Sequence, residues 1–402
     1  MRALGLLFCV PVAVVAFACG GSGGGGSGGG DDGGASSSSG GSSSGSGSSS
    51  GTSSSSGSSS GTSSSSGSSS GTSSSSGSSS GSASSSGGQG EAGACGTCPS
   101  GFSCGSGGYC VNAHGVPAFD HVYLIMMENT SQSAIQGSSK APYINSLMTT
   151  YGYTKNYSTT YHPSLPNYLD VTSGTNQGIK CDCDADSTET KCGAVCLGGC
   201  YCPISGQHLG DELDGASVTW REYSEGAGGP CATKNNNAAH YATKHVPFLY
   251  YTDLASNSAT CQDRVRDYGD LAGDLAAGPR RFNMISPNLC DDMHDSCAPT
   301  NNGIAQGDAW LGTEVPKLLA TPGFQAGGKD VLFIVWDEQT GSTGGAGTPM
   351  LCIAVGPLVK PGSTSSQAYT HESLLATFED TFGVVRLNNA AQVPSPINDL
   401  WK

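Results

Sequence analysis

Two short apolar runs of the chain each end in a pair of side chains that can bind a metal ion. The first pair is Glu128-Asn129 and the second is Asp337-Glu338. Carboxylate and amide oxygens suit hard or borderline divalent cations. One pair alone is a weak signal, because acidic residues often end strands at a protein surface. Two pairs in matching positions predict one cation site, built from segments about two hundred residues apart.

The sequence between the two pairs supplies a candidate nucleophile. Ser164 lies in the motif His162-Pro-Ser-Leu-Pro-Asn-Tyr, where two prolines flank it and indicate a rigid turn. On such a turn Ser164 could face the cation, which would lower the pKa of its hydroxyl and make it a nucleophile. Read alone, the motif is only a turn, so this assignment depends on the metal-binding pairs.

Two histidines lie in settings that favour chemistry. His294 follows Asp292 and precedes Asp295 in a polar loop after an apolar run, and His245 precedes an aromatic segment. A histidine beside a carboxylate can bind a phosphoryl oxygen, protonate a leaving group or ligate a metal. Other histidines have no such setting and are expected to be structural or exposed: His114, His208 and His240.

Short apolar runs rich in β-formers predict the strands that position these residues. The expected strands are Val122–Met127, Ser217–Trp220, Phe282–Ser286, Val331–Trp336 and Leu351–Val355. Helical patterns cover Ala141–Tyr151, Gly307–Ala320 and His371–Phe382, the last with Thr370 as N-cap. The alternation predicts an α/β fold with a doubly wound, mostly parallel sheet and helices on both faces. Ligands bind beyond the carboxyl ends of such strands, which is where both acidic pairs lie.

Composition divides the chain into four parts. Residues 1–18 resemble a signal peptide, and small residues before Cys19 resemble a bacterial lipobox, although Leu or Val is commoner where Ala16 stands. Residues 19–94 are almost entirely Gly and Ser, which predicts a lipidated, disordered tether. Residues 95–112 form a compact Cys cluster, and residues 116–402 have the composition of one catalytic domain. This organisation predicts an exported protein, lipid-anchored to the bacterial cell envelope through Cys19.

Charge and cysteine content restrict the partners and the compartment. The formal net charge is -15 with only 17 Lys and Arg, which argues against nucleic acid or an anionic bilayer as the main partner. The 17 cysteines indicate disulfides in an exported chain. Cys352, inside an apolar run, is the candidate unpaired thiol. In the 95–112 cluster, disulfides are preferred to a zinc site. Further disulfides are expected to pin loops through Cys231, Cys261, Cys290 and Cys297.

A Cys-rich insertion at 181–202 remains open to two interpretations. Asp182, Asp184 and Asp186 alternate with its cysteines, so a zinc or calcium knuckle is conceivable. In an oxidising compartment, a disulfide-stapled surface insertion is favoured.

The ordered set of motifs resembles a phosphoesterase family, that of bacterial and fungal acid phosphatases and phosphatidylcholine-type phospholipases C, in the alkaline phosphatase superfamily. The resemblance runs from about Phe119 to the C-terminus. It rests on His121-Val-Tyr-Leu-Ile-Met-Met-Glu-Asn, His162-Pro-Ser-Leu-Pro-Asn-Tyr, Lys244-His-Val-Pro-Phe, Ser286-Pro-Asn-Leu-Cys-Asp-Asp-Met-His-Asp, Trp336-Asp-Glu and Tyr369-Thr-His-Glu-Ser-Leu-Leu. It implies an alkaline-phosphatase-like fold and a hydrolase that acts on phosphate esters.

The resemblance also implies roles for individual residues. The divalent metal would be held by Glu128, Asn129, Asp337, Glu338 and the oxygen of the nucleophile Ser164. His245 and His294 would surround the phosphoryl group, with Asp292 in support. The matching motifs contain His162 and His371 as well, without a role implied for either.

Departures from the family pattern bear on the substrate. The phospholipase branch follows Glu-Asn with Arg-Ser-Phe-Asp, where this chain has Thr130-Ser-Gln-Ser. That branch follows Asp-Glu with an aromatic loop, where this chain has Gln339-Thr-Gly-Ser-Thr-Gly-Gly. The preferred interpretation is therefore an acid-phosphatase-like enzyme that forms a phosphoserine. A phospholipase C and a catalytically inactive surface-binding protein are the alternatives. The 181–202 insertion has no counterpart in the family pattern.

Overall fold

The computed structural model describes residues 95–159, 161–186, 202–340 and 349–402. The expected signal peptide, Cys19, the Gly/Ser tether and most of the Cys-rich insertion lie outside these residues. Among the described helices, none is both long enough and apolar enough to cross a membrane.

An eight-stranded sheet forms the centre of the fold, with the order β10-β4-β9-β8-β3-β7-β5-β6. Its neighbouring strands are parallel, except that β9 is antiparallel to both β4 and β8. The mostly parallel α/β prediction is therefore confirmed. The strands are β3 (Val122–Met127), β4 (Gly152–Thr154), β5 (Trp220–Ser224), β6 (Val265–Asp267), β7 (Phe282–Ser286), β8 (Val331–Trp336), β9 (Cys352–Val355) and β10 (Ser363–Ser365).

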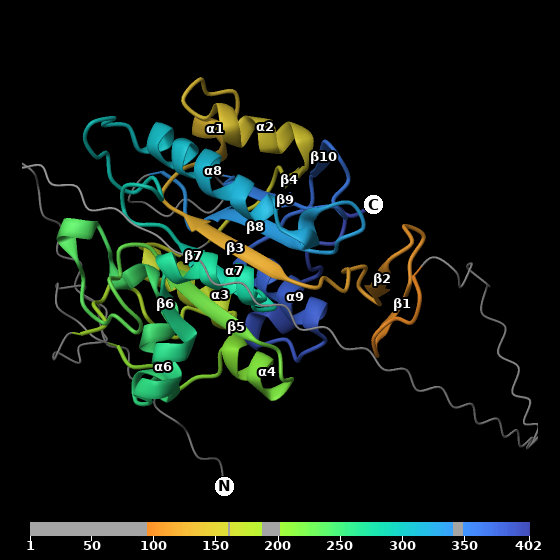
Figure 1. Cartoon of the computed structure of the whole chain (residues 1–402), viewed down its shortest axis with the longest axis horizontal. Coiled ribbons are helices and arrows are strands. Elements are labelled where there is room, and N and C mark those ends of the chain that lie inside the picture. The colour runs from red at the N-terminus through yellow and green to blue at the C-terminus, as the bar shows by residue number, and fades with distance from the viewer. Residues whose placement is uncertain (1–94, 160, 187–201, 341–348) are drawn as a thin grey trace, which may run out of the picture. The chain divides into compact units, whose positions relative to one another are not determined.

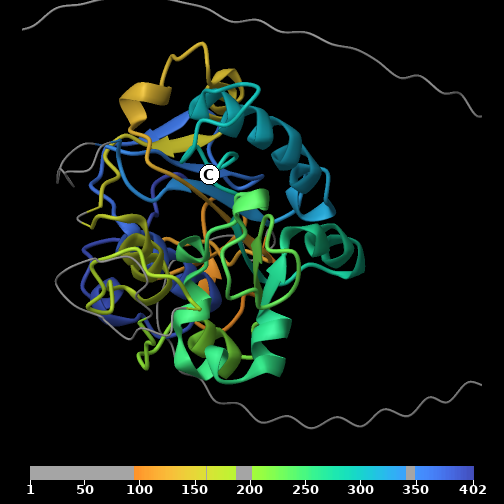
Figure 2. The ribbon, with the colours of Figure 1, turned by 90° about the vertical axis from the view of Figure 1, so that its left-hand side faces the viewer.

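Helices cover both faces of this sheet (Figure 1). Helices α2 and α8 pack together on one face, and α3 and α9 pack together on the other. Figure 2 shows the two layers from another side, with α8 in cyan and α9 in blue separated by the sheet. The helices are α1 (Gln132–Ile135), α2 (Pro142–Thr150), α3 (Ser164–Ser173), α4 (Leu209–Gly215), α5 (Thr252–Ala255), α6 (Ser258–Arg264), α7 (Leu271–Ala277), α8 (Gly303–Leu319) and α9 (His371–Phe382).

The central strands are apolar along their whole length because helices cover both sides of them. Every residue of β3 and of β8 is buried, which is the pattern of strands in doubly covered parallel sheets. The predicted bounds of β3, β7, β8 and α9 are confirmed, as is the N-cap of α9, where the Thr370 hydroxyl accepts from the Ser373 amide.

Two local predictions were wrong. The strand expected at Ser217–Trp220 begins instead at Trp220 and runs to Ser224. Two charged residues interrupt the apolar pattern of that strand. One of them, Arg221, is buried and forms ion pairs with Asp263 and Asp274. The turn expected at Ser164 is instead the start of α3. Proline is tolerated in a first helical turn, because the amides there have no partner within the helix.

Disulfides fix the Cys cluster and two loops. The cluster forms a two-stranded antiparallel unit of β1 (Phe102–Cys104) and β2 (Cys110–Asn112). The preference for disulfides over zinc is confirmed, and Cys352 is free and buried, as predicted. The pairs are Cys95–Cys104, Cys98–Cys110, Cys231–Cys261 and Cys290–Cys297. In the insertion, Cys181, Cys183 and Cys202 are disulfide-bonded, which agrees with the stapled interpretation.

Candidate active site

The two acid-tipped strands are neighbours in the sheet. β3 pairs in parallel with β8, in a register that puts Met127 opposite Trp336. The following residues therefore leave the sheet together at its carboxyl edge, and the Asn129 amide donates to Asp337 Oδ1 at 3.0 Å. Asn129 has a φ of 49°, a left-handed conformation that asparagine tolerates better than most residues.

Ser164 joins this edge from the first turn of α3. Its hydroxyl is almost fully buried and donates to Glu128 Oε2 at 2.9 Å. The side-chain amide of Asn129 donates to the same oxygen at 2.7 Å. The predicted nucleophile and the predicted β3 pair therefore lie in direct contact, although they come from separate elements.

Four buried carboxyl groups share this region, and we call them the acid cluster: Glu128, Asp292, Asp337 and Glu338. Burial is the main cause that raises the pKa of each one, to about 6 for Asp337 and about 9 for Glu338. The neighbouring acids then raise the pKa of Glu128 further. So many adjacent acids repel one another when ionised, and a bound cation would relieve that repulsion.

The donor atoms of the acid cluster fit a divalent cation. Within the described residues, Asp337 Oδ2 is buried and accepts no hydrogen bond. Glu128 Oε1 and Asp292 Oδ2 also lack a hydrogen bond, and each faces a ring nitrogen of His245. Unpartnered buried carboxylate oxygens are costly without a cation or a proton, and oxygen ligands of this kind suit magnesium, calcium or manganese.

Glu338, the third acid of the predicted metal set, has other partners. Glu338 Oε2 lies 2.5 Å from His162 Nδ1 and 3.4 Å from Asn167 Nδ2.

In the described part of the chain, groups of three ligand atoms within 4.8 Å of one another occur elsewhere, and the acid cluster is not among them. These groups are Cys95/Cys98/Cys110, His240/Cys290/Cys297 and His208/Asp211/Asp253. The first two contain disulfide-bonded cysteines, so their sulfurs are not free thiolate ligands.

His245 bridges two members of the acid cluster. Its Nε2 lies 3.1 Å from Glu128 Oε1 and its Nδ1 lies 3.2 Å from Asp292 Oδ2. The ring also stacks on Tyr168 of α3, with a centroid distance of 5.0 Å and an interplanar angle of 6°. Burial, followed by the charges of Lys244 and His294, lowers the pKa of His245 well below its usual value. The imidazole is therefore neutral, and it links the Ser164–Glu128 pair to Asp292.

His294 is held by Lys244 and Asp295. Lys244 Nζ lies 3.1 Å from His294 Nε2, and Asp295 Oδ1 lies 2.8 Å from His294 Nδ1. An ammonium can only donate, so Nε2 accepts and Nδ1 carries the proton. The Lys244 ammonium therefore lies beside Nε2 of His294. Its positive charge suits the recognition of a phosphoryl oxygen.

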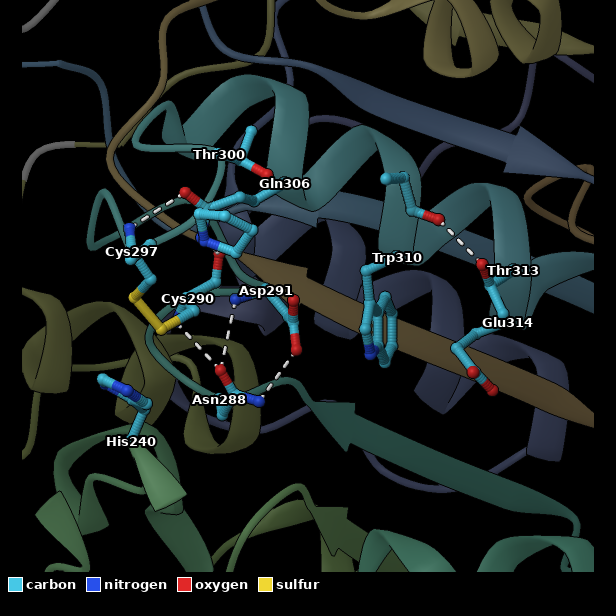
Figure 3. Close-up of a pocket in the computed structure, with 13 residues that line it drawn as sticks. His240, Asn288, Cys290, Asp291, Cys297, Thr300, Gln306, Trp310, Thr313 and Glu314 are labelled. Carbon is cyan, nitrogen blue, oxygen red and sulfur yellow. Dashed lines mark hydrogen bonds between the residues drawn. A yellow bond between two sulfur atoms is a disulfide. The ribbon is translucent and has the colours of Figure 1, made fainter. Parts of the chain in front are cut away.

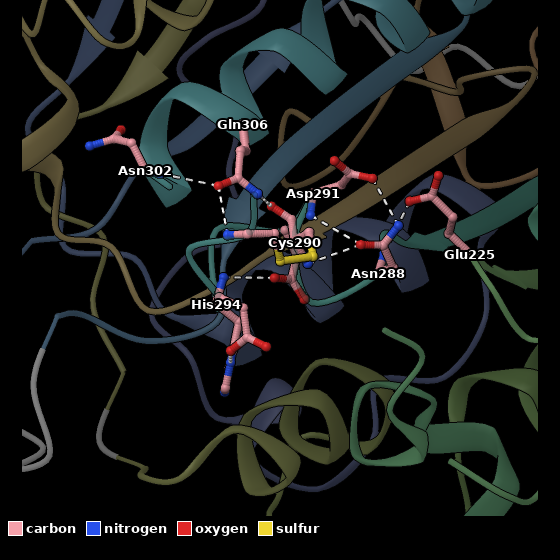
Figure 4. Close-up of a disulfide and its surroundings, with 10 residues drawn as sticks. Glu225, Asn288, Cys290, Asp291, His294, Asn302 and Gln306 are labelled. Atoms are coloured by element: carbon pink, nitrogen blue, oxygen red, sulfur yellow. Dashed lines mark hydrogen bonds and ion pairs between the residues drawn. A yellow bond between two sulfur atoms is a disulfide. The ribbon is translucent and has the colours of Figure 1, made fainter. Parts of the chain in front are cut away.

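The loop that carries Asp292 and His294 is closed by the Cys290–Cys297 disulfide (Figure 4). Gln306 of α8 holds both ends, because its Oε1 accepts from the Cys297 amide at 2.9 Å and its Nε2 donates to the Cys290 carbonyl at 3.1 Å. Between them Met293 has a φ of 86°. A bulky residue persists in that conformation only where its surroundings impose it, so the disulfide ring and α8 fix the two site residues.

His371 supports the acid cluster from behind. Its Nε2 donates to the Asp337 carbonyl at 2.7 Å, and its Nδ1 accepts from the Tyr157 hydroxyl at 2.8 Å. The ring is fully buried, and it ties the start of α9 to the end of β8. This residue of the matching motifs therefore positions the backbone of a candidate ligand.

Two cavities lie beside the disulfide ring. One of about 510 Å³ is lined by Asn129, Thr130, His294 and Thr340, among others, and opens onto the candidate site. The other, of about 530 Å³, is lined by residues that include Asp291 and is shown in Figure 3. Neither lining contains Ser164 or a member of the acid cluster, but the first contains the predicted site residues Asn129 and His294 and the second contains neither. The first cavity is therefore the candidate catalytic mouth.

The sequence prediction missed two charged residues of the site. Lys244 contacts His294, and Asp182 contacts both Lys244 and the start of α3. Lys244 directly precedes His245 in a quoted motif, which was an available signal. Asp182 was considered only as one of three alternating acids in a possible metal knuckle, and the described residues give it a different environment.

Comparison with known proteins confirms the predicted family. The model described as the Phosphoesterase family matches residues 137–385. The chain is 29% identical over 300 residues to a protein named phosphatidylinositol-3-phosphatase from Mycobacterium tuberculosis, covering 72% of this chain and 85% of the relative. It is 22% identical to a probable acid phosphatase from Kluyveromyces lactis, covering 67% of this chain and 60% of that protein.

Among solved structures, a similar one is a protein in the alkaline phosphatase superfamily from Vibrio parahaemolyticus. The TM-score is 0.46 at 10% identity, and the match covers 68% of this chain and 72% of that one.

Proposed function

Because this chain belongs to the Phosphoesterase family and is a phosphoric ester hydrolase, we propose that it hydrolyses phosphomonoesters with Ser164 as the nucleophile. The observation that carries the proposal is the 2.9 Å hydrogen bond from Ser164 Oγ to Glu128 Oε2. It places a hydroxyl, and an acceptor for its proton, inside a buried acid cluster.

In the proposed reaction Ser164 Oγ attacks phosphorus as the bond to the leaving oxygen breaks. The hydroxyl proton passes to Glu128 Oε2, which already accepts the hydrogen bond of that hydroxyl at 2.9 Å. The leaving oxygen takes a proton from the Lys244–His294 pair. His245 is a second candidate donor if it is recharged through Asp292. A water molecule then attacks phosphorus and gives one proton back to the Lys244–His294 pair. The bond from phosphorus to Ser164 Oγ breaks, phosphate leaves, and Oγ recovers its proton from Glu128.

A divalent cation completes the proposed site. Glu128, Asn129, Asp337 and Glu338, together with Ser164 Oγ, would hold it. When bound, it supplies positive charge that favours the ionised hydroxyl and neutralises phosphoryl oxygens, where phosphoryl transfer gains most. Asp292 would orient His245 beside Glu128 without ligating the cation.

We propose a phosphomonoester as the substrate because the chain lacks the sequences that follow Glu-Asn and Asp-Glu in the phospholipase branch, and polar side chains from the corresponding loops line the candidate mouth. Thr130 and Thr340 line it together with Asn129 and His294. The loops after β3 and β8 are tied by Ser131 and Thr340, whose amides and hydroxyls bond reciprocally at 3.2 Å. The name of the mycobacterial relative adds a lipid-borne phosphomonoester, phosphatidylinositol 3-phosphate, to the substrates worth testing.

Replacing Ser164 tests this proposal. Ser164→Ala should lower kcat for p-nitrophenyl phosphate by at least about 10³-fold, while the melting temperature stays close to that of the parent. Ser173→Ala, at the other end of α3, is the matched control and should keep kcat. A phosphoserine trapped by acid quench and mapped to Ser164 by mass spectrometry would identify the intermediate. Full activity of Ser164→Ala would refute the assignment.

Chelation and substrate choice test the rest of the proposal. Removal of bound metal should abolish turnover, and metal analysis before and after should show a stoichiometric loss that added divalent cation reverses. Release of nitrophenol from p-nitrophenylphosphorylcholine, but not from p-nitrophenyl phosphate, would instead indicate a phospholipase C. Activity on neither substrate from metal-loaded protein would favour a binding role.

The location of the enzyme is part of the proposal. Residues 1–18 would direct export, and Cys19 would carry the lipid that anchors the chain to the cell envelope. The disulfides among the described residues are consistent with an oxidising compartment. Labelling with a radioactive fatty acid, lost in Cys19→Ala, would establish the anchor.

A further inference from the structure

The first described residues of the Cys-rich insertion reach the candidate active site. Asp182, between two disulfide-bonded cysteines, accepts hydrogen bonds through both carboxylate oxygens. Oδ1 accepts from the Leu165 amide at 3.0 Å and Oδ2 from Lys244 Nζ at 2.9 Å. One side chain therefore links the element that carries the nucleophile to the cation beside His294.

The contact with Leu165 supplies the cap that α3 lacks in its own sequence. The N-cap residue is Pro163, whose side chain accepts no hydrogen bond from the helix. Pro166 has no amide proton, so the Ser164 and Leu165 amides are the donors of the first three helical positions. A carboxylate at this place satisfies the Leu165 amide and interacts favourably with the helix dipole. Asp182 therefore stabilises the turn that aims Ser164 Oγ at Glu128.

The contact with Lys244 orients the phosphoryl-facing side of the site. The Asp182 and Lys244 side chains are 28% and 18% exposed, so water screens their ion pair only in part. Lys244 Nζ reaches His294 Nε2 at 3.1 Å from the same position. A long lysine side chain has many rotamers, and the carboxylate restricts it to those in which the ammonium meets His294.

The segment around Asp182 is itself held in place. Cys181 and Cys183, on either side of it, are buried as well as disulfide-bonded. The Tyr250 hydroxyl donates to the Cys183 carbonyl. The Ala185 amide donates to Thr243 Oγ1 at 3.2 Å, next to Lys244 in sequence. Asp182 is thus fixed from both sides, as a residue that orients others must be.

We propose that Asp182 is a positioning residue for phosphoryl transfer, which holds the first turn of α3 through one oxygen and Lys244 through the other. The inference rests on the proposed role of Ser164 and gives the Cys-rich insertion a role in catalysis. The two oxygens have separable effects. Loss of the cap lowers kcat, and loss of the ion pair weakens the binding of the phosphoryl group.

Two substitutions separate these effects. Asp182→Asn keeps an oxygen that can accept from the Leu165 amide but removes the charge that holds Lys244. Asp182→Ala removes both functions. Asp184→Asn is the matched control, because Asp184 lies two residues further along the same segment and accepts from Asn235. The readouts are kcat for p-nitrophenyl phosphate, the inhibition constant of inorganic phosphate and the melting temperature, all on the full-length, metal-loaded chain.

We expect Asp182→Ala to lower kcat by about 10²-fold, the scale of a small misplacement of reacting groups, and to weaken inhibition by phosphate. Asp182→Asn should recover most of kcat but keep the weakened phosphate inhibition. Asp184→Asn should match the parent in both. Values of kcat and phosphate inhibition close to the parent in Asp182→Ala would overturn the inference. So would an equal loss of both in the two Asp182 variants. If Asp182→Ala fails to fold, the kcat and inhibition values of Asp182→Asn decide the question.

The same experiments distinguish failure of the Asp182 inference from failure of the proposed role of Ser164. If Ser164→Ala is inactive and Asp182→Ala is fully active, the inference alone fails. If Ser164→Ala remains active, the nucleophile is wrong, yet weakened phosphate inhibition in Asp182→Asn would still support the placement of Lys244.

Discussion

Not every buried carboxyl group of this protein belongs to the candidate site. Glu379 of α9 is fully buried, with one oxygen accepting from the Leu387 amide at 2.7 Å. Burial raises its pKa to about 9. Unlike the acid cluster, it has a separate structural role, so its titration reports on folding stability.

The raised pKa predicts the sign of a pH effect. An acid whose pKa rises on folding favours the folded state below its unfolded pKa, near 4.5. That contribution is lost as pH rises toward 9. Glu379→Gln cannot ionise, so it should gain stability relative to the parent between pH 5 and pH 8.5. The gain should be on the order of 4 kcal/mol. Denaturant midpoints at both pH values measure it, and a constant difference between the two proteins would contradict the assignment.

The chemistry of single residues was predictable where sequence position fixes location. Glu128 and Asp337 directly follow buried strands, so their place at the carboxyl edge followed from the strand pattern. The contacts of Asp182 and Lys244 did not follow, because they depend on where the segment around Asp182 lies relative to α3 and to Lys244. No local pattern encodes a contact of this kind between distant loops, and the nearest signal was the alternation of acids with cysteines.

Helix α3 carries the candidate nucleophile at its start and packs tightly against another segment at its end. It begins with the nucleophile at Ser164 and ends at Gly174, whose φ is 73°. A Cβ at Gly174 would lie 2.7 Å from the Leu387 carbonyl oxygen and 3.2 Å from the Ala390 amide nitrogen. The helix end is therefore packed against the segment after α9, and it requires glycine for both conformation and space.

Substitution of this glycine has a matched comparison in the same fold. Gly174→Ala should lower the free energy of unfolding by about 2–4 kcal/mol, since backbone strain and a steric clash add. Gly383 ends α9 with a φ of 69° but has no atom within 4 Å of the added Cβ. Gly383→Ala should therefore cost only about 1 kcal/mol. Equal losses in denaturant unfolding would show that the clash is relieved by movement.

At the scale of elements, long apolar strands were predictable and short or proline-containing elements were not. β3 and β8 follow from six consecutive buried residues each. β4, β6 and β10 have three residues each, too few to display a period. α3 starts with two prolines within four residues, Pro163 and Pro166, and local sequence alone favours a turn there. Packing against α9 and the cap from Asp182 favour the helix instead.

At the scale of the whole molecule, the described residues, from Cys95 to Lys402 with their gaps, all belong to one compact unit. The candidate site draws its residues from Glu128 to His371, within that unit. A chain that begins at Cys95 should therefore keep kcat/KM for p-nitrophenyl phosphate, provided its disulfides form. A chain that begins after Asn112 loses β1 and β2 and should melt at a lower temperature. Loss of activity in the first variant would show that the upstream residues contribute to catalysis.

The small β1–β2 unit lies at the opposite end of the strands from the reaction. Its Tyr109 hydroxyl donates to the carbonyl of the last residue, Lys402. A cavity beside it is lined by Cys95 together with Asp120, Arg281 and Lys329, which precede β3, β7 and β8. The chain thus enters the fold at the amino ends of the strands (Figure 1), whereas Ser164 and the acid cluster lie at the carboxyl ends.

This polarity separates the entry of the chain from the candidate mouth. Cys95 lines a cavity with residues that precede the strands, whereas Asn129 and His294 line the mouth beyond their carboxyl ends. If the proposed lipid on Cys19 anchors the chain, a domain resting on its Cys95 side would present the mouth to freely diffusing esters. A phosphate ester in the anchoring membrane would be reached only after the domain turned over.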